Sequence, residues 1–147
     1  MKNLLPGILL LFAGFMWASC QKNDGNFQST IAGDWNVVMD TTWSSGIGPY
    51  GTPSSTKYIG VPGDYYNFTA NGKLYVKEGT QKLDTADYTV SGDTLKLTYN
   101  YLYEGGVSIQ GAIGRYIITT LNNQNLVLTQ DFVTPGGIID ETIVLKR

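Results

Sequence analysis

The chain has 147 residues, a formal net charge of −2 and no histidine. Without histidine, the usual serine and cysteine triads and the histidine-containing zinc sites are excluded. The acidic balance gives no electrostatic footprint for nucleic acid, and the length suits one domain with a sizeable core rather than two.

The N-terminal segment has the three parts of an export signal: a basic start at Lys2, an apolar stretch over 4–17, and small residues before the single cysteine. A membrane span needs about 20 apolar residues, so we expect cleavage rather than retention. The end of this segment, Trp17-Ala18-Ser19-Cys20, resembles a bacterial lipobox. The resemblance implies a signal peptide over 1–19, a lipid on Cys20 and a lipidated tether over 20–30.

A lipid on Cys20 implies a protein of the cell envelope, anchored in the outer membrane of a Gram-negative bacterium, with the membrane as its partner. Several acyl chains hold a protein far more firmly than the single chain that binds reversibly. The next residues, Gln21-Lys22-Asn23-Asp24, resemble short signals that send some lipoproteins to the cell surface. An ordinary secretory signal is the alternative.

Beyond residue 30 the chain predicts an all-β domain, because short segments rich in Val, Ile, Thr and Tyr alternate with clusters of Gly, Asn, Asp and Pro. The clearest hairpin joins 65–69 to 73–77 through Asn71-Gly72, a pair that favours a type I′ turn. A second hairpin joins 88–90 to 94–97 around Ser91-Gly92-Asp93.

The later segments complete an antiparallel meander. Strands are predicted over 115–121 and 126–131, and a final strand over 141–146 is expected to close onto an earlier one. Closure would remove the sheet edges that invite pairing between neighbouring molecules. A short helix near 102–114 is left open. Alternation places five residues on one side of a long strand: Leu95, Leu97, Tyr99, Tyr101 and Tyr103.

The segment Ile31-Ala32-Gly33-Asp34-Trp35-Asn36-Val37-Val38 resembles the Gly-x-Trp opening strand of lipocalins. The hairpin at 66–72, the Ser-Gly-Asp-Thr-Leu turn at 91–95, the strands over 117–128 and the basic C-terminus are similar to the lipocalin-like domain of small bacterial lipoproteins. The resemblance implies a single antiparallel up-and-down barrel of eight strands over 31–147, whose closed end Trp35 plugs. Later motifs of vertebrate lipocalins are absent, so no particular ligand is implied.

The lipocalin-like calyx implies a small apolar or amphipathic ligand. A long connection over 41–64 would fold over the open mouth as a lid carrying Trp43, Tyr50 and Tyr58. The alternative is a strand over 56–61 with the remainder packed as an Ω-loop. The candidate ligand contacts are Trp35, Trp43, Tyr50, Tyr58, Phe68, Tyr88, Tyr99 and Tyr101. Core packing is the competing interpretation for Trp35 and for the tyrosines of the long strand.

Carboxylate pairs are the remaining route to catalysis, and neither nearby pair is convincing. Asp84 with Asp87, and Asp140 with Glu141, are interpreted as solvated surface residues. We therefore expect no enzyme, no catalytic residue, no metal and no cofactor, and a monomer. The alternative function is a surface module with a solid barrel that binds protein or glycan through Trp43, Tyr50 and the loops at 105–106 and 136–137.

Overall fold

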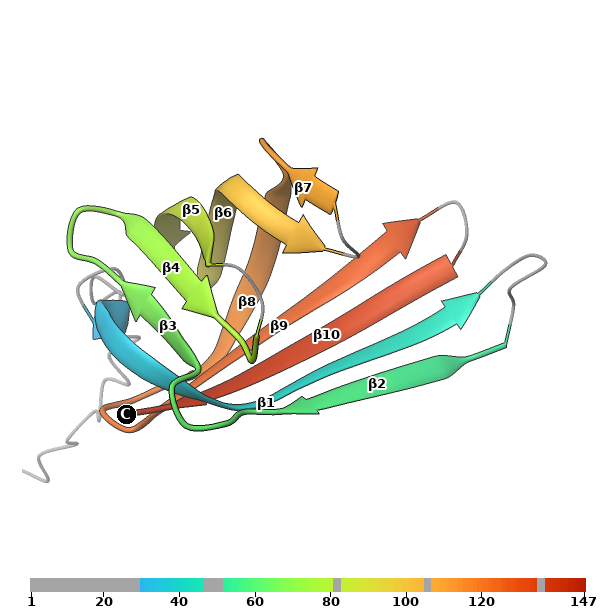
Figure 1. Cartoon of the computed structure of the whole chain (residues 1–147), viewed down its shortest axis with the longest axis horizontal. Helices are drawn as coiled ribbons and strands as arrows, with labels where there is room; N and C mark the ends of the chain where they lie inside the picture. The colour runs from blue at the N-terminus through green and yellow to red at the C-terminus, as the bar shows by residue number, and fades with distance from the viewer. Residues whose placement is uncertain (1–29, 47–51, 81–82, 105–106, 135–136) are drawn as a thin grey trace, which may run out of the picture.

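The computed structural model describes residues 30–46, 52–80, 83–104, 107–134 and 137–147 (Figure 1). These residues form ten antiparallel strands: β1 (Gly33–Gly46), β2 (Ser54–Ile59), β3 (Tyr65–Phe68), β4 (Lys73–Lys77), β5 (Asp84–Ser91), β6 (Thr94–Glu104), β7 (Val107–Ile109), β8 (Ile113–Leu121), β9 (Asn125–Thr134) and β10 (Gly137–Lys146). Residues 1–29, which include the predicted signal peptide, Cys20 and almost all of the tether, lie outside the described part, as does Tyr50.

Eight of the strands close into a ring. Their order is β1-β3-β4-β5-β6-β8-β9-β10, and β10 pairs back onto β1. Strand β2 pairs with β1 and strand β7 pairs with β6, both outside the ring. The predicted all-β, up-and-down barrel of eight strands is confirmed, including the final strand that closes onto the first.

Strand β1 takes part both in the barrel ring and in a sheet that extends beyond it. Its first residues pair with β3, and residues 39–44 pair with β2, while β10 follows it along nearly its whole length. A register shift between Val37 and Met39 marks the change of partner, and Gly60 packs against it so closely that a Cβ would lie 2.0 Å from the Val37 carbonyl oxygen. Strands β2, β1, β10 and β9 therefore run on together beyond the ring (Figure 1).

Half of the predicted long connection over 41–64 is strand. Residues up to Gly46 continue β1, and Ser54–Ile59 form β2, so the lid prediction is corrected to a β-hairpin. The alternative strand over 56–61 is largely confirmed. The physical reason is that β10 offers β1 a partner far past the barrel wall, and pairing satisfies its backbone groups there.

Two local predictions are corrected. The hairpin at Thr69 is not a type I′ turn. Such a turn needs a positive φ at both central residues, and Asn71 has a negative φ, since only glycines have a positive φ among the described residues. Gly72 (φ 81°) donates to the Thr69 carbonyl, and Thr69 donates to the Lys73 carbonyl, which gives a three-residue loop with a glycine bulge. The helix left open near 102–114 is replaced by β7, which pairs back onto β6.

Apolar side chains seal one end of the barrel, which we call the closed end. Trp35 is 0% exposed there, and its indole nitrogen donates to the Ile31 carbonyl at 2.7 Å. The Arg147 guanidinium lies 4.0 Å from the Trp35 ring and donates to the Ala32 carbonyl. Around the Trp35 ring the core is fully buried and aliphatic or aromatic, with Ile31, Phe68, Leu74, Leu95, Leu126 and Leu145. The predicted plug is confirmed.

Candidate ligand-binding site at the barrel mouth

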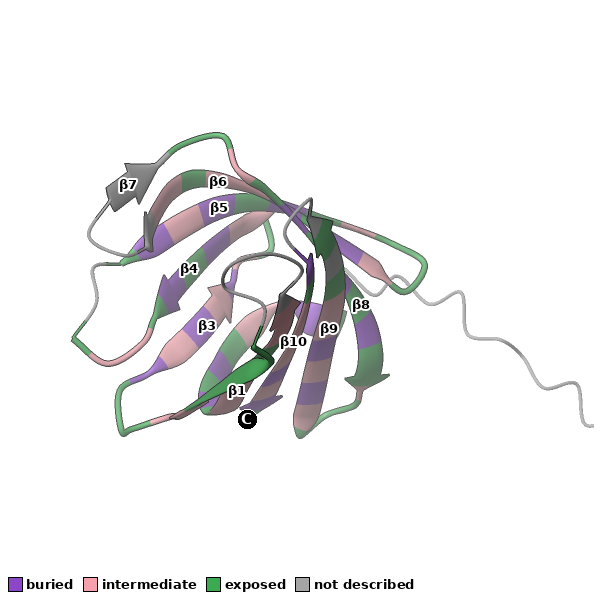
Figure 2. Ribbon diagram, turned by 90° about the vertical axis from the view of Figure 1, so that its right-hand side faces the viewer, coloured by how far each residue is buried: buried purple, intermediate pink, exposed green. Residues whose placement is uncertain are grey.

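The interior changes character along the barrel. Buried and exposed residues alternate along most of β8, and buried residues alternate with half-buried ones in the first half of β9 (Figure 2). The buried rows are apolar near the closed end, and the same rows become polar at the opposite end, which we call the mouth. On β9, for example, Leu126 and Leu128 are followed by Gln130, and on β10 Leu145 and Ile143 are preceded by Glu141.

A cavity of about 400 Å³ opens at the mouth. One part of its wall is polar, with Thr42, Tyr99, Tyr116, Gln130 and Glu141. The rest is apolar or small, with Leu102, Ala112, Ile113, Gly114 and Ile139. These residues come from β1, β6, β8, β9, β10 and the segment before β8, so the cavity exists only because the ring closes.

Two backbone features shape this space. Gly114 on β8 has no side chain, which lets two rings pack against its backbone: a Cβ there would lie 3.1 Å from the Tyr116 ring and 3.4 Å from the Tyr99 ring. On β6, Asn100 is an extra residue, because Ala86 pairs with Tyr99 while Thr85 pairs with Tyr101. This bulge shifts the alternation by one position, so Leu102 rather than Tyr101 joins Tyr99 in the cavity wall.

A hydrogen-bonded group links three strands inside the mouth. The Tyr116 hydroxyl donates to Glu141 Oε2 at 2.9 Å, and Gln130 Nε2 donates to the same oxygen and to the Tyr116 hydroxyl oxygen. Burial raises the pKa of the Tyr116 hydroxyl well above its ordinary value, with Tyr99 and Glu141 adding to the effect. Both Tyr99 and Tyr116 therefore stay neutral near pH 7, as hydroxyl groups able to donate.

Two more carboxyl groups lie close to this group. Burial raises the pKa of Asp40 to about 7, and the charges of Glu141 and Glu78 add to the shift. Burial also raises the pKa of Glu78, although a hydrogen bond with Tyr66 opposes the shift. The mouth is thus an anionic site in which the carboxyl groups disfavour one another's ionisation.

Three acceptor atoms in this region lack a donor among the described residues. They are Asp40 Oδ1, Glu78 Oε1 and Gln130 Oε1, each shielded from solvent. A buried acceptor without a donor is energetically costly, so most such atoms in proteins are paired. These unpaired acceptors distinguish the mouth from the closed end, whose core is apolar.

Three predicted ligand contacts belong to the packed core instead. Trp35 plugs the closed end, Phe68 is 1% exposed, and Tyr88 packs edge-on against Phe68 with ring centroids 5.2 Å apart. The Tyr88 hydroxyl donates to the Thr69 carbonyl at 2.7 Å. These aromatic residues fill the barrel below the mouth, in keeping with the core interpretation held open for Trp35.

The other predicted ligand contacts lie in different parts of the molecule. Tyr99 lines the cavity, whereas Tyr101 is half-buried and is not among the described lining residues. Trp43 is 41% exposed on β1, opposite Ser55 of β2 and Asp140 of β10. Strand β2 therefore leaves Trp43 on the surface of the four-strand extension, and it is not part of a lid.

Tyr58 has a structural partner. Its hydroxyl donates to Asp64 Oδ2 at 2.5 Å, and Asp64 also accepts from the backbone amides of Val61 and Gly79, both at 2.7 Å. Burial acts to raise the pKa of Asp64, but these three hydrogen bonds outweigh it and lower the pKa. The network fastens the end of β2 to the turn after β4, so Tyr58 positions the hairpin.

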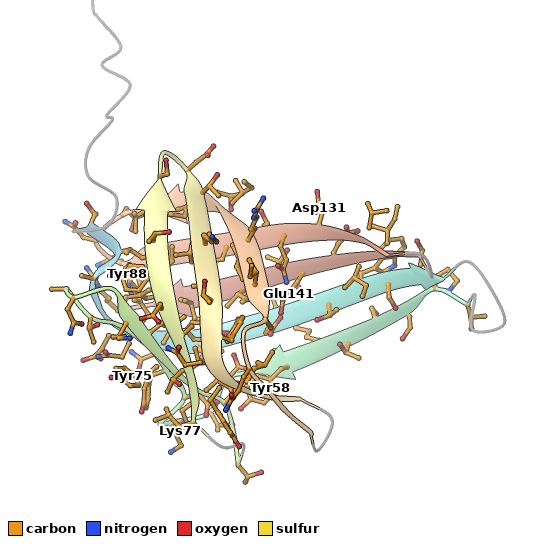
Figure 3. All side chains as sticks on the ribbon, turned by 90° about the horizontal axis from the view of Figure 1, so that it is seen from above. Tyr58, Tyr75, Lys77, Tyr88, Asp131 and Glu141 are labelled. Carbon is orange, nitrogen blue, oxygen red and sulfur yellow. The ribbon has the colours of Figure 1, made fainter. Side chains whose placement is uncertain are left out.

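Two acidic residues interpreted as solvated surface are corrected. Asp84 is 8% exposed, and Glu141 lines the cavity; Asp87 is exposed and forms an ion pair with Lys73. Figure 3 shows Glu141 among the strands, whereas Asp131 points away from β9. The signal was present in the alternation, because each of these acids and Glu78 continues an apolar row at a spacing of two: Asp84-x-Ala86, Glu141-x-Ile143 and Val76-x-Glu78.

A second hollow, of about 530 Å³, lies on the outer surface of β1, β3 and β4. It is lined by Asp34, Asn36, Tyr65, Asn67, Tyr75 and Leu83. The Asn67 side-chain amide donates to Asp34, so part of its polar lining is already paired. This hollow is shallower and more open than the cavity, and it faces solvent rather than the barrel interior.

The described residues contain no group of three or more cysteine or acidic side chains arranged to hold a metal ion. Within the same part of the chain, no helix has the length and apolar character needed to cross a membrane.

No family model and no curated protein matches this chain. Two solved structures are similar: a lipocalin-like protein from Bacteroides uniformis (17% identity, TM-score 0.45, covering 80% of this chain and 98% of the other) and an uncharacterized protein from Bacteroides eggerthii (13% identity, TM-score 0.46, covering 79% and 98%). In its ring of eight antiparallel strands, closed by the last strand and plugged by a tryptophan on the first, the chain has a lipocalin-like fold.

Proposed function

We propose that this protein is a lipid-anchored binding protein of the cell envelope, not an enzyme, and that it holds a small apolar or amphipathic molecule in the barrel mouth. The cavity carries the proposal. Its volume of about 400 Å³ falls in the range of about 300 to 1,000 Å³ typical of ligand sites. Its wall combines apolar side chains with a few placed polar groups, which is the usual composition of such sites.

The barrel can support such a site because its other end is packed solid. A ring of eight strands is just wide enough either to be filled by its side chains or to hold one small ligand. Here the closed end is filled by Trp35, Phe68 and their neighbours, and the cavity occupies the mouth. A ligand in the mouth would not have to displace the core.

The test is saturable binding of N-phenyl-1-naphthylamine, a neutral apolar fluorophore, to the full chain carrying Cys20→Ser. We expect one site, and Ala112→Phe, which fills the cavity, should weaken binding at least tenfold. Ile117→Phe is the matched control, because Ile117 is exposed on the outer face of β8. The proposal is wrong if binding does not saturate, or if both phenylalanine variants behave alike.

Anchoring has its own test. Cells expressing the chain are labelled with radioactive palmitate, and the label should appear on the wild type and be absent from Cys20→Ser. The lipobox-like segment before Cys20 supports this expectation. An unlabelled wild-type protein would instead indicate an ordinary secretory signal, and fractionation of labelled cells would assign the outer membrane and its exposed face.

The alternative, binding of protein or glycan at the surface, was predicted at Trp43, Tyr50 and the loops at 105–106 and 136–137, but Tyr50 and most of these loop residues lie outside the described residues. Among the described residues, the outer hollow supports such a function. Tyr65 and Tyr75 border it beside amide and carboxylate groups, a combination that suits stacking and hydrogen bonding to a sugar ring. If Tyr75→Ala abolishes binding to a glycan while Ala112→Phe leaves it unchanged, glycan binding at the surface is favoured over ligand binding in the cavity.

A further inference from the structure

We propose that the barrel mouth selects a cationic ligand, a protonated amine or guanidinium carried on a small apolar body. The inference rests on the proposed function, because it names the class of molecule that the same cavity takes. It is carried by the cavity, by acceptor atoms that lack donors, and by the charges around them.

The first step concerns hydrogen bonds. Gln130 and Tyr116 direct their donors to Glu141, and this leaves Gln130 Oε1 without a donor among the described residues. Asp40 Oδ1 and Glu78 Oε1 are in the same condition, and all three atoms are shielded from solvent. Of these three residues, Gln130 lines the cavity itself, and Asp40 and Glu78 lie behind the wall. A ligand that carries N–H donors would meet the Gln130 acceptor, whereas a carboxylate ligand would add acceptors.

The second step concerns charge. Carboxyl groups reach this region from four elements: Asp40 on β1, Glu78 after β4, Asp84 on β5 and Glu141 on β10. The groups facing them from β3, β6 and β8 are Tyr66, Tyr99 and Tyr116, whose pKa values burial raises, so they stay neutral. The described cavity wall contains no lysine or arginine. A ligand cation in the cavity would be attracted by this negative charge.

The third step separates a molecular cation from a metal ion. No described group of three or more acidic side chains could hold a metal, so the carboxyl groups are spread around the mouth rather than gathered at a point. The remaining wall is apolar, with Leu102, Ala112, Ile113 and Ile139. Spread acceptors beside apolar surface fit an amine with a hydrocarbon body, not a bare ion.

The experiment compares three probes with the same eight-carbon chain: octylammonium, octanol and octanoate. Calorimetric titration of the full chain carrying Cys20→Ser at pH 8 should show octylammonium binding at least tenfold more tightly than octanol, with octanoate weakest. Binding of octylammonium should weaken from pH 8 to pH 6, because protonation of Asp40, whose pKa is about 7, removes charge. An ammonium group, with a pKa near 10.4 as in lysine, stays charged throughout.

Glu141→Gln and Asp40→Asn should each weaken octylammonium binding about tenfold and change octanol binding little. Asp131→Asn is the matched control, because it removes one carboxylate from the outer face of β9. Thermal unfolding of each variant establishes that it is folded. If a variant does not fold, the comparison of the three probes on the protein without mouth substitutions still tests the proposal.

Equal binding of the three probes, or tighter binding of octanoate, would overturn cation selection and leave the proposed function standing. Saturable binding of the naphthylamine without any binding of octylammonium would do the same. If neither the naphthylamine nor any eight-carbon probe binds, the proposed function fails and this inference fails with it.

Discussion

The two ends of the barrel are built from the same strands and have opposite chemistry. At the closed end, Trp35, Leu126 and Leu145 are fully buried, and Arg147 covers the Trp35 ring. At the mouth, the same rows of inward positions carry Gln130 and Glu141 around a cavity. One end provides stability by burying apolar surface, and the other keeps imperfectly paired polar groups in and behind the wall of the cavity.

The difference shows that binding sites of this kind cost stability locally and depend on packing elsewhere. Residues in the mouth retain raised pKa values and unpaired acceptors, which the apolar end offsets. Removing a carboxyl group at the mouth should therefore stabilise the protein, whereas removing an apolar side chain at the closed end should destabilise it.

The largest effect is expected at the closed end. Trp35→Ala removes the plug, and large-to-small changes of this kind lower the free energy of unfolding by about 3 to 5 kcal/mol. Urea denaturation measures the loss. Trp43→Ala, at a tryptophan that is 41% exposed, should cost less than about 1 kcal/mol. Equal losses would contradict the distinction between a core and a surface tryptophan.

At the mouth, a substitution should stabilise the protein in a pH-dependent way. Because the pKa of Asp40 is raised from 3.8 to about 7, the folded state holds this proton more tightly than the unfolded state. The contribution is fully present below about pH 4 and is lost as the pH rises to about 7. Asp40→Asn should therefore raise the free energy of unfolding at pH 8 by about 1 to 2 kcal/mol, discounted for partial solvation, and change it little at pH 4.

Denaturation curves at pH 4, 6 and 8 test this expectation, with Asp131→Asn as the control for loss of one exposed carboxylate. A stabilisation that does not grow between pH 4 and pH 8 would show that Asp40 is not held in its protonated form by the fold.

The smallest effect is expected for Tyr116→Phe. It removes the hydroxyl that donates to Glu141 while keeping the ring, which is 5% exposed, so unfolding should become easier by about 1 kcal/mol. Tyr75→Phe on the outer surface is the matched control and should be neutral. If the two variants are equally stable, the hydrogen-bonded group in the mouth adds nothing to folding, and the contrast between the ends is sharper than proposed.

Much of the fold could be predicted because it depends on local patterns. The hairpins around Gly72 and Gly92 and the later strands follow from alternation and turn residues, and the tryptophan of the first strand was expected from the resemblance to lipocalins. Of the candidate ligand contacts, Tyr99 is the one that the described cavity wall contains. Asp40, Glu78 and Glu141 were not predicted as site residues, because an acid at the end of a strand ordinarily faces water.

The sequence by itself determined most of the strand segments and their alternation, since both depend on residues close together in the chain. Tertiary structure decided the rest. The bulge after Val37 and the extra residue Asn100 set which side chains face inward, and their positions depend on pairing with distant strands. Ring closure between β1 and β10 then gathers acids separated by up to a hundred residues, and only that burial turns ordinary surface carboxyl groups into a site.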